Sequence, residues 1–138
     1  MKIYFAGSVR GGREKRKEFE MIIGKLKEYG RVLTEHISEP EEEKFVYHQT
    51  DREIYEQHIN WLRESDIMVA EVSIRSIGVG YEIGYADAMN KRVICLYDQS
   101  SEKKLSAMIR GNHKITILEY TDINEALERL AKIFAGEV

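Results

Sequence analysis

KIYFAGSVRGGR, residues 2–13, is the stretch that decides the fold. It begins with the apolar run 2–6, whose length and aromatic and β-branched content predict a buried strand. A glycine-bearing turn follows, and residues 14–29 then have helical periodicity up to Gly30, which ends the predicted helix. A strand, a glycine turn and a helix in this order are typical of the first unit of an α/β protein.

The same alternation continues along the chain. Apolar runs predict further strands at residues 31–34, 67–71, 92–96 and 116–119, and helical spacing predicts helices at 51–64, 79–90 and 105–110. Asp122 caps a final amphipathic helix whose apolar positions are Ile123, Ala126, Leu127, Leu130, Ile133 and Phe134. The order βαβαβαβαβα, with right-handed crossovers, predicts one domain over residues 1–138, an open, doubly wound sheet of five parallel strands.

In such a sheet the ligand crevice lies beyond the carboxyl ends of the strands, so residues that follow strands are the candidates for function. Residues 35–49 contain Pro40 and the acidic run 41–43 and have little periodicity. They predict a mobile loop over that edge of the sheet.

Composition excludes several classes of protein. The net charge of −3 argues against a general nucleic-acid binder, although a small anionic ligand is compatible with it. No apolar run is long enough to span a membrane and no signal-peptide pattern begins the chain, so we expect a cytoplasmic protein without a membrane partner. Cys95 is the only cysteine and falls in a predicted strand, and the four histidines lack metal-ligand spacing. The sequence predicts neither a metal nor a cofactor.

Two loops at the predicted sheet edge suit an anion. In GSVRGGR, residues 7–13, glycines permit close backbone approach, while Ser8 and Arg10 add a hydroxyl and a cation. This spacing matches neither GxGxxG nor GxxxxGK[ST], so an ordinary turn fits it equally well. In SIGVGYE, residues 76–82, two glycines beside Ser76 again suit close approach, and Glu82 falls early in the following helix. A glutamate there is more often a dipole partner than a catalyst.

Other candidates have a structural interpretation as well as a functional one. His58 could titrate near neutral pH and act as a general acid, but a lone helical histidine is more often a packing residue. Trp61 and Tyr4 are predicted to belong to the core, unless the Tyr4 hydroxyl reaches the crevice. Glu71 ends the third strand at the catalytic edge and could line the pocket, whereas Asp66 is expected to be a turn residue.

Four separated motifs combine these features: IYFAGSVRGGRE (3–14), VLTEH (32–36), GVGYEIG (78–84) and LSAMIRG (105–111). Together they closely resemble the 2′-deoxynucleoside 5′-monophosphate N-hydrolases of the nucleoside 2-deoxyribosyltransferase superfamily, and the resemblance runs from residue 1 to about residue 134. It implies a flavodoxin-like sheet with strand order 2-1-3-4-5. It also implies a homodimer whose active sites take residues from the neighbouring subunit.

The resemblance assigns roles to three residues. Glu82 matches the glutamate that attacks C1′ of the deoxyribose, giving a glycosyl-enzyme ester that water hydrolyses with retention of configuration. Tyr4 matches the tyrosine that holds this nucleophile in place. His58 stands where the family usually has an aspartate that assists protonation of the departing base. We expect an imidazolium to replace it, with Glu82 and the substrate phosphate raising the pKa of His58 above its ordinary value of about 6.5.

The resemblance also implies a set of substrate-binding residues: Gly7, Ser8, Val9, Arg10, Gly11, His36, Ser76, Gly78, Ser106 and Met108. Ser106 and Met108 are expected to reach the neighbouring active site. The deoxyribosyltransferases that resemble this chain carry an acidic side chain near position 76 and an amide near position 106. A carboxylate would repel a phosphate dianion and a serine hydroxyl can donate to it, so these serines favour a nucleotide over a nucleoside.

The expected reaction releases a free nucleobase and 2-deoxyribose 5-phosphate from a deoxynucleoside 5′-monophosphate. Three alternatives stay open at this point. They are transfer of deoxyribose between bases, N-glycosidase action on a ribonucleotide or modified nucleotide, and a nucleotide-binding module without catalysis. The preferred base is also open.

Overall fold

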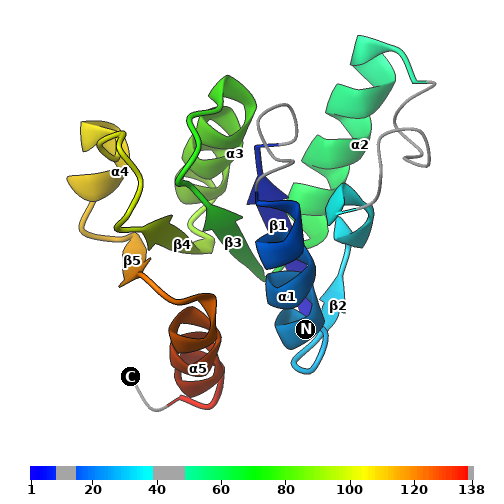
Figure 1. The fold of residues 1–138 in the computed structure, drawn as a ribbon. Helices are drawn as coiled ribbons and strands as arrows, with labels where there is room; N and C mark the ends of the chain where they lie inside the picture. The colour runs from blue at the N-terminus through cyan, green and yellow to red at the C-terminus, as the bar shows by residue number, and fades with distance from the viewer. Residues whose placement is uncertain (9–14, 39–48, 137–138) are drawn as a thin grey trace.

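The computed structural model describes residues 1–8, 15–38 and 49–136. Its strands are β1 (Lys2–Gly7), β2 (Arg31–Val32), β3 (Ile67–Glu71), β4 (Arg92–Asp98) and β5 (Thr116–Tyr120). All pair in parallel, in the order β2-β1-β3-β4-β5 (Figure 1). The predicted five-stranded parallel sheet and its strand order are therefore confirmed.

Helices cover both faces of this sheet (Figure 1). On one face lie α1 (Arg16–Leu26) and α5 (Ile123–Phe134), and on the other lie α2 (Asp51–Glu64) and α3 (Ile77–Ala88). The short helix α4 (Ala107–Arg110) follows β4. The two layers of helices enclose two separate apolar clusters, one against each face of the sheet.

Alternation along the strands decides which side chains reach which cluster. In β1, Ile3 and Phe5 pack towards α1 and α5, whereas Tyr4 packs towards α2 and α3. Cys95 lies in the second cluster and is fully buried, as expected for a strand thiol. Burial, with the nearby charge of Glu71, raises the pKa of Cys95 to about 12, so this thiol is not a nucleophile at neutral pH.

Several predicted boundaries were wrong. Helix α1 ends at Leu26 instead of residue 29, α3 begins at Ile77 instead of residue 79, and residues 35–38 form a 3₁₀ helix, η1, where we expected a loop. Strand β2 has two residues instead of four because the Thr34 side chain takes over the pairing: its hydroxyl accepts from Phe5 N at 2.9 Å and donates to Phe5 O at 2.6 Å. The rest of the expected loop, 39–48, lies outside the described residues.

Gly7 at the end of β1 is required by packing. A Cβ at this position would lie 2.6 to 3.0 Å from three atoms of the Phe19 ring, which itself packs edge-on against Phe5. We expect Gly7→Ala to lower the free energy of unfolding by about 1–3 kcal/mol, because the ring must shift in a filled core. Urea denaturation measures this. Gly24→Ala is the matched control, since a Cβ there meets nothing within 4 Å and alanine favours the helix, so its stability should stay equal or rise.

Candidate active site

Three predicted site residues from three different elements meet at one point. The Tyr4 hydroxyl on β1 donates to Oε2 of Glu82 on α3. The same hydroxyl lies 2.9 Å from Nδ1 of His58 on α2. Tyr4 is buried, whereas Glu82 and His58 are half-buried, so the group reaches the surface on its helix side. The structure thus gives Tyr4 the contact with Glu82 that the resemblance implied.

Burial raises the pKa of Glu82 to about 7, and the hydrogen bond from Tyr4 opposes part of this rise. The pKa of Tyr4 is itself raised, by burial first and then by the charge of Glu82, so its hydroxyl keeps its proton and remains a donor. A partly buried carboxylate held by a fixed donor is suited to nucleophilic attack, and it becomes ionised as the pH rises through about 7.

The expectation for the pKa of His58 was wrong for the geometry seen here. Burial, and to a smaller extent repulsion from His36, together lower the pKa of His58 to about 4. The Tyr4 hydroxyl lies between the imidazole and Glu82, so the carboxylate does not pair directly with the ring. Because Tyr4 has one proton and donates it to Glu82, Nδ1 of His58 must donate to the Tyr4 oxygen. His58 is then a neutral imidazole with Nε2 as an acceptor.

Aromatic rings gather beside this group. The His58 ring centroid lies 6.1 Å from that of His36 in η1 and 5.4 Å from that of Trp61, and His36 and Trp61 are 5.2 Å apart. Trp61 was predicted to belong to the core: it is half-buried, packs against the apolar cluster on this face of the sheet and also contacts these two histidine rings. Its spacing of three residues from His58 on one helix places both on the same face, which was the signal available in the sequence.

The first turn of α3 lies beside Glu82. Ser76 is the N-cap of this helix, and its hydroxyl accepts from Val79 N at 3.2 Å. At Gly78 a Cβ would lie 3.9 Å from Ser76 Oγ and 4.0 Å from Glu82 Oε1, so the missing side chain leaves the carboxylate open on this side. Ser76, Gly78 and Glu82 are therefore brought together as the sequence predicted.

Ser106 and Met108 lie at the start of α4. Ser106 caps this helix by accepting from Met108 N at 3.2 Å, and Met108 is 84% exposed. With Ser76, both residues line a cavity of about 730 Å³ between the segment after β3 and the segment after β4. The structure does not place them against the Glu82 carboxylate within one chain, so their contact with a neighbouring active site stays a prediction.

The first glycine loop is described only in part. Gly7 ends β1, and Ser8, which follows it, is 6% exposed. Val9, Arg10 and Gly11 lie outside the described residues, so their predicted contacts with substrate stay predictions. Ser8 directly follows the strand that carries Tyr4, which places it at the carboxyl edge of the sheet.

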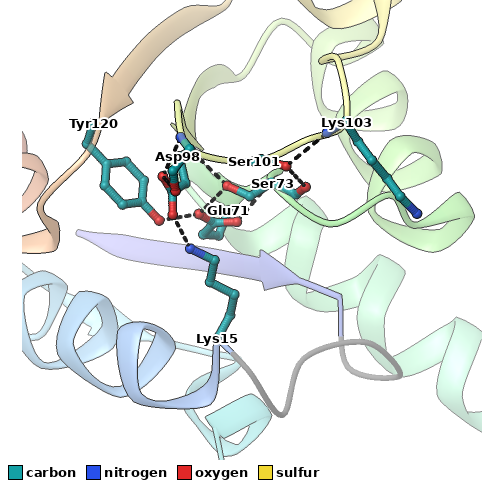
Figure 2. Close-up of polar contacts among 8 residues, drawn as sticks. Lys15, Glu71, Ser73, Asp98, Ser101, Lys103 and Tyr120 are labelled. Atoms are coloured by element: carbon teal, nitrogen blue, oxygen red, sulfur yellow. Dashed lines mark hydrogen bonds and ion pairs between the residues drawn. The ribbon is translucent and has the colours of Figure 1, made fainter.

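Glu71 does not line the pocket beside Glu82. Glu71 lies two residues after Val69 in β3, so both side chains point to the same face of the sheet, the one covered by α1 and α5. The Glu71 side chain is buried there, and the residue is 2% exposed. There it accepts from Ser73 and from the Tyr120 hydroxyl (Figure 2). Burial raises the pKa of Glu71, and these bonds and the charge of Lys15 oppose the rise.

Asp66 accepts from Lys2 N at 2.7 Å in the turn before β3, as expected of a turn residue.

Within residues 1–8, 15–38 and 49–136, no cluster of three or more histidine, cysteine, aspartate or glutamate side chains is arranged to hold a metal ion. None of the helices in that part of the chain combines the length and the hydropathy needed to cross a bilayer.

A family model described as nucleoside 2-deoxyribosyltransferase matches residues 3–123. The chain therefore belongs to the nucleoside 2-deoxyribosyltransferase family, to which its strand order and the Tyr4–Glu82 contact had pointed.

Individual relatives narrow this further. The chain is 46% identical over 126 residues to the 5-hydroxymethyl-dUMP N-hydrolase of Danio rerio, covering 91% of this chain and 88% of the relative. It is 49% identical over 114 residues to the enzyme of the same name from Homo sapiens, covering 79% of this chain and 64% of the relative. The solved structure of Clostridium botulinum CMP N-glycosidase shares the fold, with a TM-score of 0.74 at 20% identity over 95% of this chain and 98% of that one.

Proposed function

We propose that this protein hydrolyses the N-glycosidic bond of 2′-deoxynucleoside 5′-monophosphates. The observation that carries the proposal is the Glu82 carboxylate, held by Tyr4 and open on the Gly78 side, next to the Ser76 turn. The names of the N-hydrolase relatives support the same reaction. The products would be a free nucleobase and 2-deoxyribose 5-phosphate.

In the proposed mechanism, the ionised Glu82 attacks C1′ while the C1′–N bond to the base breaks. The electron pair of that bond leaves with the base, and Glu82 becomes an ester of the sugar. Water then attacks C1′ on the face that the base left, which releases Glu82 and retains the configuration. Because its pKa is about 4, His58 is uncharged at neutral pH and lacks the extra proton that an acid would donate to the departing base. Its Nε2 can accept a hydrogen bond from the attacking water and orient it, and the departed base takes up the proton that this water releases.

For the base we propose a pyrimidine that meets the His36, His58 and Trp61 rings. Flat rings with polar nitrogens suit a planar heterocycle that carries a polar substituent. Because the N-hydrolase relatives are named for 5-hydroxymethyl-dUMP, a modified pyrimidine of this kind is the first substrate to test.

We further propose that two copies complete each active site, with Ser106 and Met108 supplied by the neighbouring subunit. Ile77 and Met108, which are 96% and 84% exposed, both line the cavity between α3 and α4. Exposed apolar side chains of this size around one cavity are typical of a contact surface. Sedimentation velocity at assay concentration tests this, and a monomer that remains fully active would contradict it.

The decisive assay incubates the protein with single deoxynucleoside 5′-monophosphates, including 5-hydroxymethyl-dUMP, and detects the free base by chromatography. A ribonucleotide tests selectivity at the 2′ position, and a second base added during turnover tests transfer. Absence of base release from every nucleotide over hours would reject the hydrolase. A new nucleoside monophosphate would instead indicate a transferase.

Ser76→Asp tests the phosphate site. A carboxylate beside a dianion costs binding energy, so we expect kcat/KM for the nucleotide to fall about a hundredfold and the preference for nucleotide over nucleoside to shrink. The helix should survive, since aspartate is also a good N-cap. Ser106→Asp makes the same change at the other predicted serine. Unchanged kcat/KM in both variants would place the phosphate elsewhere.

A further inference from the structure

A buried polar network on the opposite face of the sheet from Glu82 has no part in the mechanism above. At its centre, Oε1 of Glu71 accepts from Ser73 N at 2.8 Å, and Oε2 accepts from Ser73 Oγ at 2.8 Å and from the Tyr120 hydroxyl at 2.5 Å (Figure 2). All three partners donate, so Glu71 is held as an ionised carboxylate. It fixes Ser73, the start of the segment that leads to Ser76.

The same network ties this segment to the one after β4. Ser73 Oγ accepts from Asp98 N at 2.8 Å, and Ser73 O accepts from Ser101 Oγ at 3.1 Å (Figure 2). Asp98 ends β4, and Ser101 lies in the loop that leads to Ser106. The segments that carry the two phosphate-suited serines are therefore joined by the hydrogen bonds of Ser73, which lines the same cavity as both serines.

Lys15, which stands just before α1, adds a positive charge to this network. Its Nζ lies 2.6 Å from Asp98 Oδ2 and 5.6 Å from the Tyr120 ring centroid, and both side chains of the ion pair are mostly buried. Its charge also acts on Glu71, so it offsets the buried Glu71 carboxylate as well as that of Asp98.

We propose that the Lys15–Asp98 ion pair, together with Glu71 and Ser73, is a positioning network that holds the segments after β3 and β4 in register. These residues take no part in the proposed chemical steps, so they act through Ser76 and Ser106. The inference rests on the proposed function for the identity of the phosphate ligand. Removing the cation leaves Glu71 and Asp98 to repel each other, and the segment after β4 moves away from the segment after β3.

Lys15→Met removes the charge and keeps a chain of similar length. We expect KM for the deoxynucleoside 5′-monophosphate to rise about threefold to tenfold, with kcat changed by less than about twofold, because the network affects phosphate binding and not the nucleophile. Dissociation constants for dUMP and deoxyuridine, measured by calorimetry, should show the loss for dUMP alone. Lys15→Arg should restore binding, since a guanidinium can form the same pair.

Lys114→Met is the matched control. Lys114 pairs with Asp87 at 2.9 Å, but at the far end of α3, so dUMP binding should not change. Ser101→Ala is a second test that leaves every charge in place and removes the bond to Ser73 O, and it should weaken dUMP binding in the same direction. The melting temperature of each variant is measured alongside.

Unchanged dUMP binding in folded Lys15→Met and Ser101→Ala would overturn the positioning role. Equal losses for dUMP and deoxyuridine would overturn it too, since they would indicate general loosening of the fold. The calorimetric comparison is made with Glu82→Gln added to every protein, which prevents cleavage of dUMP during the titration. If the native protein binds dUMP but releases no base, the proposed hydrolysis fails while the positioning role is still measured.

Discussion

Glu82→Gln should reduce base release by at least about a thousandfold, because an amide of the same shape cannot form the glycosyl ester. The carboxamide can still accept from Tyr4, so the fold and nucleotide binding should change little. Initial rates of base release, with dUMP binding measured in parallel, separate the chemical step from binding.

The covalent intermediate gives an independent readout. Native protein quenched during turnover should show an added mass of one 2-deoxyribose 5-phosphate unit on the peptide that contains Glu82, and Glu82→Gln should show none. Glu128→Gln is the control, since Glu128 is exposed on α5, a helix on the other face of the sheet. Activity within about tenfold of native in Glu82→Gln would rule out nucleophilic catalysis at this position.

Tyr4→Phe should reduce kcat roughly a hundredfold, because it removes a hydrogen bond that orients Glu82, the proposed nucleophile. The ring remains, so the core around it stays filled. The substitution also removes the acceptor of the His58 Nδ1 proton, which frees the imidazole to rotate. Both effects act on catalysis more than on KM.

The pH profile distinguishes this role from a general loss of structure. Glu82 must be ionised to react, so activity of the native protein should fall as the pH drops through about 7. The bond from Tyr4 lowers the pKa of Glu82, so losing it raises that pKa and should move the acidic limb of Tyr4→Phe to higher pH. A profile of kcat/KM against pH from 5 to 9 measures the shift. A limb at the same pH in both proteins would show that Tyr4 does not act on Glu82.

The order of strands and helices could be predicted because the spacing of apolar residues and the length of each apolar run distinguish strands from helices. Alternating apolar runs and helical segments defined the order of elements, although the right-handed rule and the resemblance were needed for the strand order. The predicted length of β2 was wrong, because the strand-like sequence pattern continues to Thr34 whereas the strand ends at Val32. The side chain of Thr34 makes bonds that a backbone pattern cannot reveal.

The resemblance was needed to bring Tyr4 and His58, which lie on other elements, to Glu82. Ser76, Gly78 and Glu82 lie within the first two turns of one helix and follow one strand, so their proximity could be predicted from the sequence. The lowered pKa of His58 could not be predicted from the sequence, because it depends on burial and on His36, which lies on another element. The Lys15–Asp98 pair joins residues 83 positions apart without any local signal. Glu71 could have been assigned to the correct face from the alternation in β3.

The alternation of β1 has a consequence for how this protein can change. The Tyr4 hydroxyl reaches Glu82, while the neighbours Ile3 and Phe5 belong to the opposite cluster, and Tyr4 pairs with Met68 in the parallel register. Inserting or deleting one residue inside this strand would turn the tyrosine to the wrong side of the sheet and carry an apolar side chain towards Glu82. Insertions and deletions that preserve catalysis must therefore lie in the connections between strands and helices. To change the base that the enzyme accepts, these connections should be lengthened or shortened and β1 left intact.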